Sequence, residues 1–131
     1  RETLPYMSQL NLSVAPIILA EQCRVALGDE IAQILNARIV AMLIGERPGL
    51  SSPDSLGVYL TYAPHVGSLD SERNCISNIR PEGLTYPRAA FKLAWLIESA
   101  FALGKTGTTL KDQSDDPKCQ LGLKPISSLE F

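Results

Sequence analysis

The sequence has little of the residue types that build metal centres and disulfide frameworks. It contains one histidine, and its three cysteines, Cys23, Cys75 and Cys119, are far apart and odd in number. That pattern argues against a disulfide framework, and the chain has no Cys-x-x-Cys pair that could clip a metal ion. With a single histidine, a multi-histidine metal site within this chain is excluded.

Strong net charge and long apolar runs are also missing. The formal net charge is −2 over 131 residues, which leaves no electrostatic footprint for nucleic acid or an anionic membrane. No apolar stretch approaches the ~18–20 residues that span a bilayer. The chain begins at Arg1 without a charged-then-apolar leader, so we expect a soluble, cytoplasmic piece of a protein whose N-terminus lies upstream. A hydrophobic content of 45% predicts one domain with one core.

The most apolar segment is residues 38–44, and a loop rich in turn formers follows it. The run Ile-Val-Ala-Met-Leu-Ile lacks alternation and is typical of a strand covered on both faces. The loop then presents Glu46 and Arg47 at the carboxyl end of that strand, where open α/β sheets bind their ligands. An ordinary connection rich in turn formers is the alternative interpretation of the same residues.

Hydrophobic spacing predicts an α/β order for the remaining chain. The strongest signal is a helix from Thr85, which can cap it, to Gly104, where we expect it to stop. A strand, a short helix and a second strand before the loop predict a βαβ unit with parallel strands. The expected elements, in chain order, are helical turns within 1–11, a strand at 15–20, a short helix near 30–35, strands at 38–44, 56–62 and 75–79, the long helix, and a loosely held tail at 111–131.

Three predicted loop ends, at 24–25, 46–49 and 75–78, would then converge on one edge of the sheet. They supply the guanidinium of Arg24, the side chain of Val25, the carboxylate of Glu46, the thiol of Cys75 and free backbone amides. This mixture suits a large neutral ligand with many amide groups better than a small anion. For Cys75 the alternative is a buried structural thiol, which is the commonest fate of a free cysteine.

At these residues the chain resembles a known family. The blocks are Arg24-Val25 followed by Gly28-Asp29-Glu30-Ile31, Gly45-Glu46-Arg47-Pro48-Gly49-Leu50, and Arg73-Asn74-Cys75-Ile76-Ser77-Asn78-Ile79. Their order and spacing are similar, across about residues 14–110, to the small (light) subunit of ethanolamine ammonia-lyase, an adenosylcobalamin-dependent enzyme that converts ethanolamine to acetaldehyde and ammonia.

The resemblance implies a three-layer αβα fold with a Rossmann-like, mostly parallel sheet. It also implies a partner, the large subunit, which holds the substrate, and a cofactor, adenosylcobalamin, enclosed at the subunit interface. The family's cobalamin contacts match Val25, Glu46 and Cys75 here, with Arg24 adjacent. Residues 1–110 would form the cobalamin-contacting domain and 111–131 a flexible tail. Activity from this chain alone is not expected, and the resemblance leaves open packaging in a bacterial microcompartment.

Two departures from the family keep other interpretations open. The family's small subunit is considerably longer, with an N-terminal region and an earlier strand that are absent here, and the tail after Leu110 does not match it. One alternative is therefore a non-catalytic interaction module that retains the fold but not cofactor binding. The other, a stand-alone enzyme using Glu46 and His65, has the least support from the residues.

Overall fold

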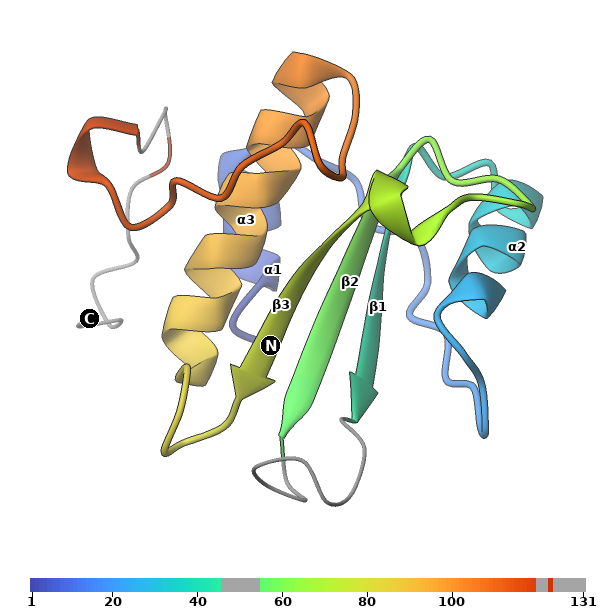
Figure 1. Cartoon of the computed structure of the whole chain (residues 1–131), viewed down its shortest axis with the longest axis horizontal. Coiled ribbons are helices and arrows are strands. Elements are labelled where there is room, and N and C mark those ends of the chain that lie inside the picture. The colour runs from blue at the N-terminus through green and yellow to red at the C-terminus, as the bar shows by residue number, and fades with distance from the viewer. Residues whose placement is uncertain (46–54, 120–122, 124–131) are drawn as a thin grey trace.

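The computed structural model describes residues 1–45, 55–119 and 123. Over these described residues the chain forms three strands, three α-helices and two short 3-10 turns (Figure 1). In chain order the elements are α1 (Leu4–Gln9), α2 (Ala26–Ile34), β1 (Ile39–Gly45), β2 (Leu56–Tyr62), η1 (Asp70–Glu72), β3 (Arg73–Ile79), α3 (Tyr86–Leu103) and η2 (Pro117–Cys119). In the described ranges, no helix is both long enough and apolar enough to cross a bilayer.

The sheet is antiparallel, with the strand order β1-β2-β3. This overturns the predicted three-layer αβα fold with a Rossmann-like, mostly parallel sheet. The predicted βαβ unit does not form either, because its first strand is absent from the described sheet. The reason for the antiparallel arrangement lies in the connections. Residues 46–55 separate β1 from β2 and residues 63–72 separate β2 from β3, whereas a parallel neighbour needs a crossover of a dozen or more residues, usually through a helix.

The strand expected at residues 15–20 is also absent. The segment is extended but belongs to no strand of the described sheet, and Ile17 and Leu19 expose 75% and 93% of their surface. A short run of β-favouring residues indicates a preference, but a strand exists only where a neighbouring strand takes up its backbone hydrogen bonds. Nothing in the described sheet pairs with this segment, so the preference is not realised.

The other predicted elements are close to those observed. Strands at 38–44 and 56–62 are confirmed, and the strand expected at 75–79 begins two residues earlier, at Arg73. The long helix α3 follows Thr85 and ends at Gly104, whose φ of 78° gives the left-handed turn that glycine adopts readily. The turns expected within residues 1–11 are α1.

The hydrophobic core lies between α3 and one face of the sheet. Leu93, Leu96 and Ile97 of α3 are at most 5% exposed, as are Leu60 and Ile76 of the strands that they cover. Helix α1 packs against α3, where the rings of Tyr6 and Phe91 meet edge to face with centroids 5.9 Å apart. This packing fixes α3 firmly on one side of the sheet, while α2 lies on the other side (Figure 1).

The chain after α3 returns along the outer surface of that helix. The Lys92 ammonium donates to a carboxylate oxygen of Asp112 at 2.9 Å and to the Ser114 hydroxyl at 2.9 Å. Further along, the Trp95 indole N–H donates to the carbonyl of Cys119. Residues 111–119 are thus attached to α3, and the flexibility predicted for the tail as a whole stays a prediction.

Candidate functional site

The face of the sheet that carries α2 is only partly covered. Residues directly opposite one another on antiparallel strands share a face, so the strand register gives its side chains in rows. The row beneath α2 is Val40, Thr61 and Arg73, the next is Met42, Tyr59 and Cys75, and the last includes Ile44 and Gly57. Thr61 in the first row is 1% exposed, but Tyr59 and Met42 in the second are only half-buried and Cys75 is exposed. The row Met42, Tyr59 and Cys75 therefore leaves an open surface beside α2.

Helix α2 approaches the sheet closely at Gly28. A β-carbon placed on Gly28 would lie 2.4 Å from the Cγ of Met42, so only glycine allows this contact. The next residue, Asp29, is 2% exposed and faces Arg73. Val25 lies three and four positions before these two contact residues, which places it on the same side of the helix, toward the sheet.

A buried ion pair joins α2 to β3. The Arg73 guanidinium meets both carboxylate oxygens of Asp29, with N···O distances of 2.8 and 2.6 Å, and their side chains are 4% and 2% exposed. Its other N–H groups donate to the Thr61 hydroxyl at 2.9 Å, the Ser68 carbonyl at 3.1 Å and Asp70 at 3.3 Å. All five N–H donors of an arginine are therefore satisfied. The hydrogen bond with Asp29 raises the pKa of Arg73, outweighing the opposite effect of burial.

The structure brings two of the predicted cofactor-contacting residues to the same side of the sheet. Val25 is half-buried at the start of α2, and Cys75 is exposed on β3 in the row next to the ion pair. Arg24 precedes Val25 and is exposed. Glu46 lies outside the described residues. The expected convergence of three parallel-strand ends is wrong because the sheet is antiparallel, and Cys75 lies within β3 rather than at a strand end.

Sequence reasoning missed the Arg73–Asp29 pair. Both residues stand in the blocks that carry the family resemblance, but they are 44 positions apart, and their pairing depends on α2 crossing the face of β3. The only signal was an aspartate followed by an apolar helical pattern, which is more simply explained as a favourable charge near the helix N-terminus.

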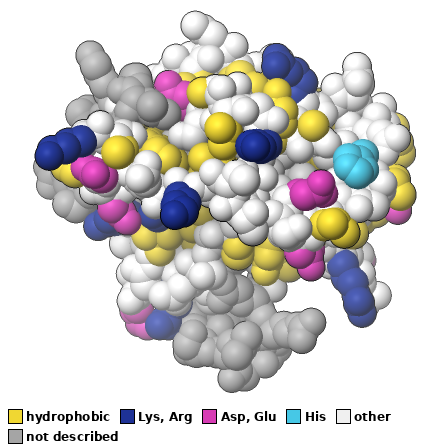
Figure 2. All heavy atoms as spheres, turned by 45° about the horizontal axis from the view of Figure 1, so that its top comes forward, with side chains coloured by type: hydrophobic (Ala, Val, Ile, Leu, Met, Phe, Trp, Pro, Cys, Tyr) yellow, Lys and Arg dark blue, Asp and Glu magenta, His cyan; other side chains and the backbone are white. Residues whose placement is uncertain are grey.

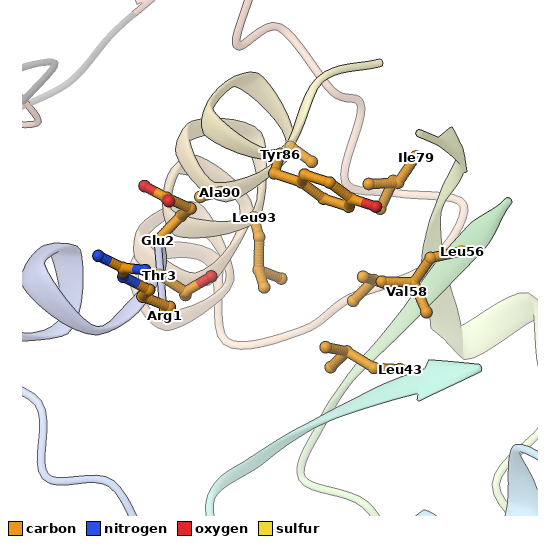
Figure 3. A pocket seen from close by; sticks show the side chains of 11 residues that line it. Arg1, Glu2, Thr3, Leu43, Leu56, Val58, Ile79, Tyr86, Ala90 and Leu93 are labelled. Carbon is orange, nitrogen blue, oxygen red and sulfur yellow. The ribbon is translucent and has the colours of Figure 1, made fainter. Parts of the chain in front are cut away.

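A separate cavity of about 290 Å³ lies on the opposite, α3-side face of the sheet. Leu43, Val58 and Ile79 of the strands and Leu93 of α3 give it apolar walls, with Arg1 at its rim (Figure 3). Of the predicted site residues that the structure describes, Arg24, Val25 and Cys75, none lines it. In the described part of the chain, no cluster of histidine, cysteine, aspartate or glutamate could hold a metal ion.

The face of the molecule seen in Figure 2 carries scattered charges of both signs. His65, the only histidine, is exposed, and its ring Nδ1 lies 3.0 Å from the neighbouring Val66 carbonyl. Its Nδ1 contact is therefore to its own loop rather than to the α2-side face. Glu46, which the stand-alone enzyme hypothesis pairs with His65, lies outside the described residues, so that hypothesis stays a prediction.

Comparison with known proteins shows which family this chain resembles. The family model of the ethanolamine ammonia-lyase light chain (EutC) matches residues 1–111. An ethanolamine ammonia-lyase small subunit from Xanthomonas campestris is 60% identical over 105 residues, which are 80% of this chain and 39% of that protein. Those from Rhodopseudomonas palustris and Pseudomonas fluorescens are 57% and 48% identical, covering 85% and 98% of this chain and 42% and 51% of theirs.

The chain thus spans about two fifths to half the length of the curated relatives that it matches. The match includes the segment with Val25, the ion pair and Cys75, so it covers the whole described part of the α2-side face. The chain belongs to the ethanolamine ammonia-lyase light-chain family.

Proposed function

We propose that this chain is the part of an ethanolamine ammonia-lyase small subunit that contacts adenosylcobalamin where the small subunit meets the catalytic large subunit. In the complex the lyase converts ethanolamine to acetaldehyde and ammonia, and this chain has no activity alone. The observation that supports the proposal is the open part of the α2-side face: Val25 at the start of α2 and Cys75 on β3 lie on the same side of the sheet.

The residues of that face fit a corrin ring. A corrin is large, nearly flat and fringed with amide groups, and the row Met42, Tyr59 and Cys75 offers apolar and soft contact with hydrogen-bonding groups beside it. The exposed Arg24 can donate to amide carbonyls or to the phosphate of the nucleotide loop. Adenosylcobalamin, when bound, supplies the radical chemistry, and these residues supply position and exclusion of water.

Glu46 completes the proposed set. It follows Gly45, the last residue of β1, and its carboxylate can accept hydrogen bonds from corrin amide N–H groups. In the complex, Glu46→Ala should raise the cobalamin dissociation constant by an amount equivalent to about 1.5–3 kcal/mol while leaving subunit association largely intact. An unchanged dissociation constant would remove Glu46 from the site.

The decisive experiment is a pull-down of this chain with a matching large subunit, with and without adenosylcobalamin, read by cobalamin absorbance in the retained fraction. Cofactor-dependent retention supports the proposal. Cys75→Trp should reduce it by covering the open face with a bulky ring, whereas Cys119→Ser, a change at the outer surface of α3, should not.

A second candidate function is an interaction module that keeps the fold without binding the cofactor. The observation that favours it is the short span of the match, since about half to three fifths of each relative's length lies outside it. This candidate predicts binding to the large subunit that is independent of adenosylcobalamin.

The localisation predicted from the sequence is part of the proposed lyase-subunit function. It is cytoplasmic, with packaging in a microcompartment left open.

A further inference from the structure

Two of the described residues proposed to contact the cofactor, Val25 and Cys75, come from elements that contact each other little. Val25 belongs to the start of α2 and Cys75 to β3, yet most of the contacts of α2 with the sheet are with β1, at the far edge from β3. Something must therefore fix the helix relative to β3 if both residues are to meet one flat ligand. The buried bridge between Asp29 and Arg73 spans this gap.

Each residue of the bridge lies close along its own element to one of the two contact residues. Asp29 follows Val25 by four residues, which is about one helical turn or ~6 Å along the axis. Arg73 precedes Cys75 by two residues, which on a strand is the same face and about 6.7 Å. Helix α2 runs in the direction opposite to β1, and β1 and β3 run in the same direction (Figure 1). Going from Asp29 back to Val25 and going from Arg73 on to Cys75 therefore both lead toward the same end of the sheet.

We infer that the Arg73–Asp29 pair is a positioning element of the cofactor site, which holds Val25 and Cys75 at the separation that the corrin requires. This inference rests on the proposed function. The fork of the guanidinium suits such a role because two parallel hydrogen bonds fix orientation as well as distance. The guanidinium also donates to the hydroxyl of Thr61 on β2 and to the carbonyl of Ser68 in the loop before β3. These hydrogen bonds fix the position of the Arg73 side chain relative to the sheet.

The pair is not explained by its contribution to stability alone. A buried ion pair is often no more stabilising than apolar residues of similar volume, although loss of one partner is costly. Its retention in the interior is better explained by a need for one defined geometry between α2 and β3. The exposed pair Arg88–Asp115, with an N···O distance of 3.1 Å, provides a matched control that joins α3 to the C-terminal segment instead.

The first test measures geometry without any cofactor. In the full chain with Cys23→Ser and Cys119→Ser, spin labels on the native Cys75 and on Val25→Cys report their separation by dipolar electron paramagnetic resonance. Asp29→Asn should broaden the distribution of separations, Arg73→Lys should do so less because it keeps the charge but loses the fork, and Arg88→Lys should leave it unchanged. If neither bridge variant alters the distribution, the inference is overturned. Where Asp29→Asn does not fold, Arg73→Lys carries the test.

The second test measures cobalamin affinity in the complex with the large subunit. Both bridge variants should raise the dissociation constant, by about tenfold for Asp29→Asn, as expected when a hydrogen bond to a charged group is misaligned. The core variant Ile97→Val, which lowers stability away from this face, should leave it unchanged and so separates positioning from a general loss of stability. Broadened separations with unchanged affinity would overturn the cofactor contact of Val25 and Cys75 rather than the bridge.

Discussion

Replacement of Trp95 tests whether the outer surface of α3 is covered by the C-terminal segment in solution. The side chain is 4% exposed, and its indole N–H donates to the carbonyl of Cys119. Burial of about 200 Å² at ~25 cal/mol per Å² corresponds to about 5 kcal/mol, which is an upper bound because the unfolded chain already buries part of that area. We therefore expect Trp95→Ala to lower the free energy of unfolding by about 3–5 kcal/mol.

A second substitution separates packing from hydrogen bonding. Trp95→Phe keeps an aromatic ring in the same place but leaves the Cys119 carbonyl without its donor, which should cost about 1–2 kcal/mol. Leu103→Ala is the matched control, because Leu103 belongs to the same helix and is 47% exposed, so its replacement should cost about 1 kcal/mol or less.

The assay is urea unfolding followed by far-ultraviolet circular dichroism. Fluorescence cannot be used across the series because Trp95 is the only tryptophan of the chain. An unchanged slope with a lower midpoint would show that stability alone has changed. A loss below about 0.5 kcal/mol for Trp95→Ala would refute the packing argument and would place that side of α3 at a subunit interface instead.

Three further predictions concern single residues. Asp29→Ala should cost about 3–5 kcal/mol because it leaves a buried guanidinium unpaired, whereas Asp115→Ala at an exposed pair should cost at most about 1 kcal/mol, both measured by urea unfolding. Gly107→Ala should lower the melting temperature, because Gly107 has a φ of 105° and a β-carbon there would lie 2.1 Å from the Ser71 carbonyl oxygen; an unchanged value would contradict that contact. Burial acts to raise the pKa of Asp112, but its hydrogen bonds and the nearby ammonium hold that pKa below its usual value of 3.8. Its contribution is therefore present above pH 3.8 and lost as the pH falls through the lower folded-state pKa, so Asp112→Asn should flatten the dependence of the unfolding midpoint on pH in that acidic range.

The sequence predicts the elements of this fold better than their arrangement. The helix from Thr85 to Gly104 is recognised because its apolar face and its terminal glycine are local signals. Thr85 stands at the N-cap position, but its side chain makes no capping hydrogen bond. The strand at 56–62 is recognised from its β-forming residues in the same way. Strand direction is not local, because a run such as 39–44 fits a parallel or an antiparallel neighbour equally well, and the length of the connection decides between them.

The candidate site shows the same division. The residues proposed to contact the cofactor were identified by resemblance to the family, and the spacing of Val25 and Cys75 along the chain could not show that they share one side of the sheet. The pair that joins their elements could not be found from spacing either, since Asp29 and Arg73 are 44 positions apart. Such a contact follows only once the direction of α2 across the sheet is known.

The two faces of the sheet are held in physically different ways. This difference supports the proposal that the α3 face forms the core and the α2 face meets the ligand. The α3 face is closed by a continuous apolar core, where each contact is non-directional and tolerates replacement by a side chain of similar size. The α2 face is held by a directional, fully satisfied ion pair and by the close approach of Gly28 to Met42. A surface that must meet a rigid, flat ligand needs defined positions more than it needs added stability, and a directional bridge supplies them. Under the proposed function, the row Met42, Tyr59 and Cys75 beside that bridge is the part of the described surface that meets the ligand.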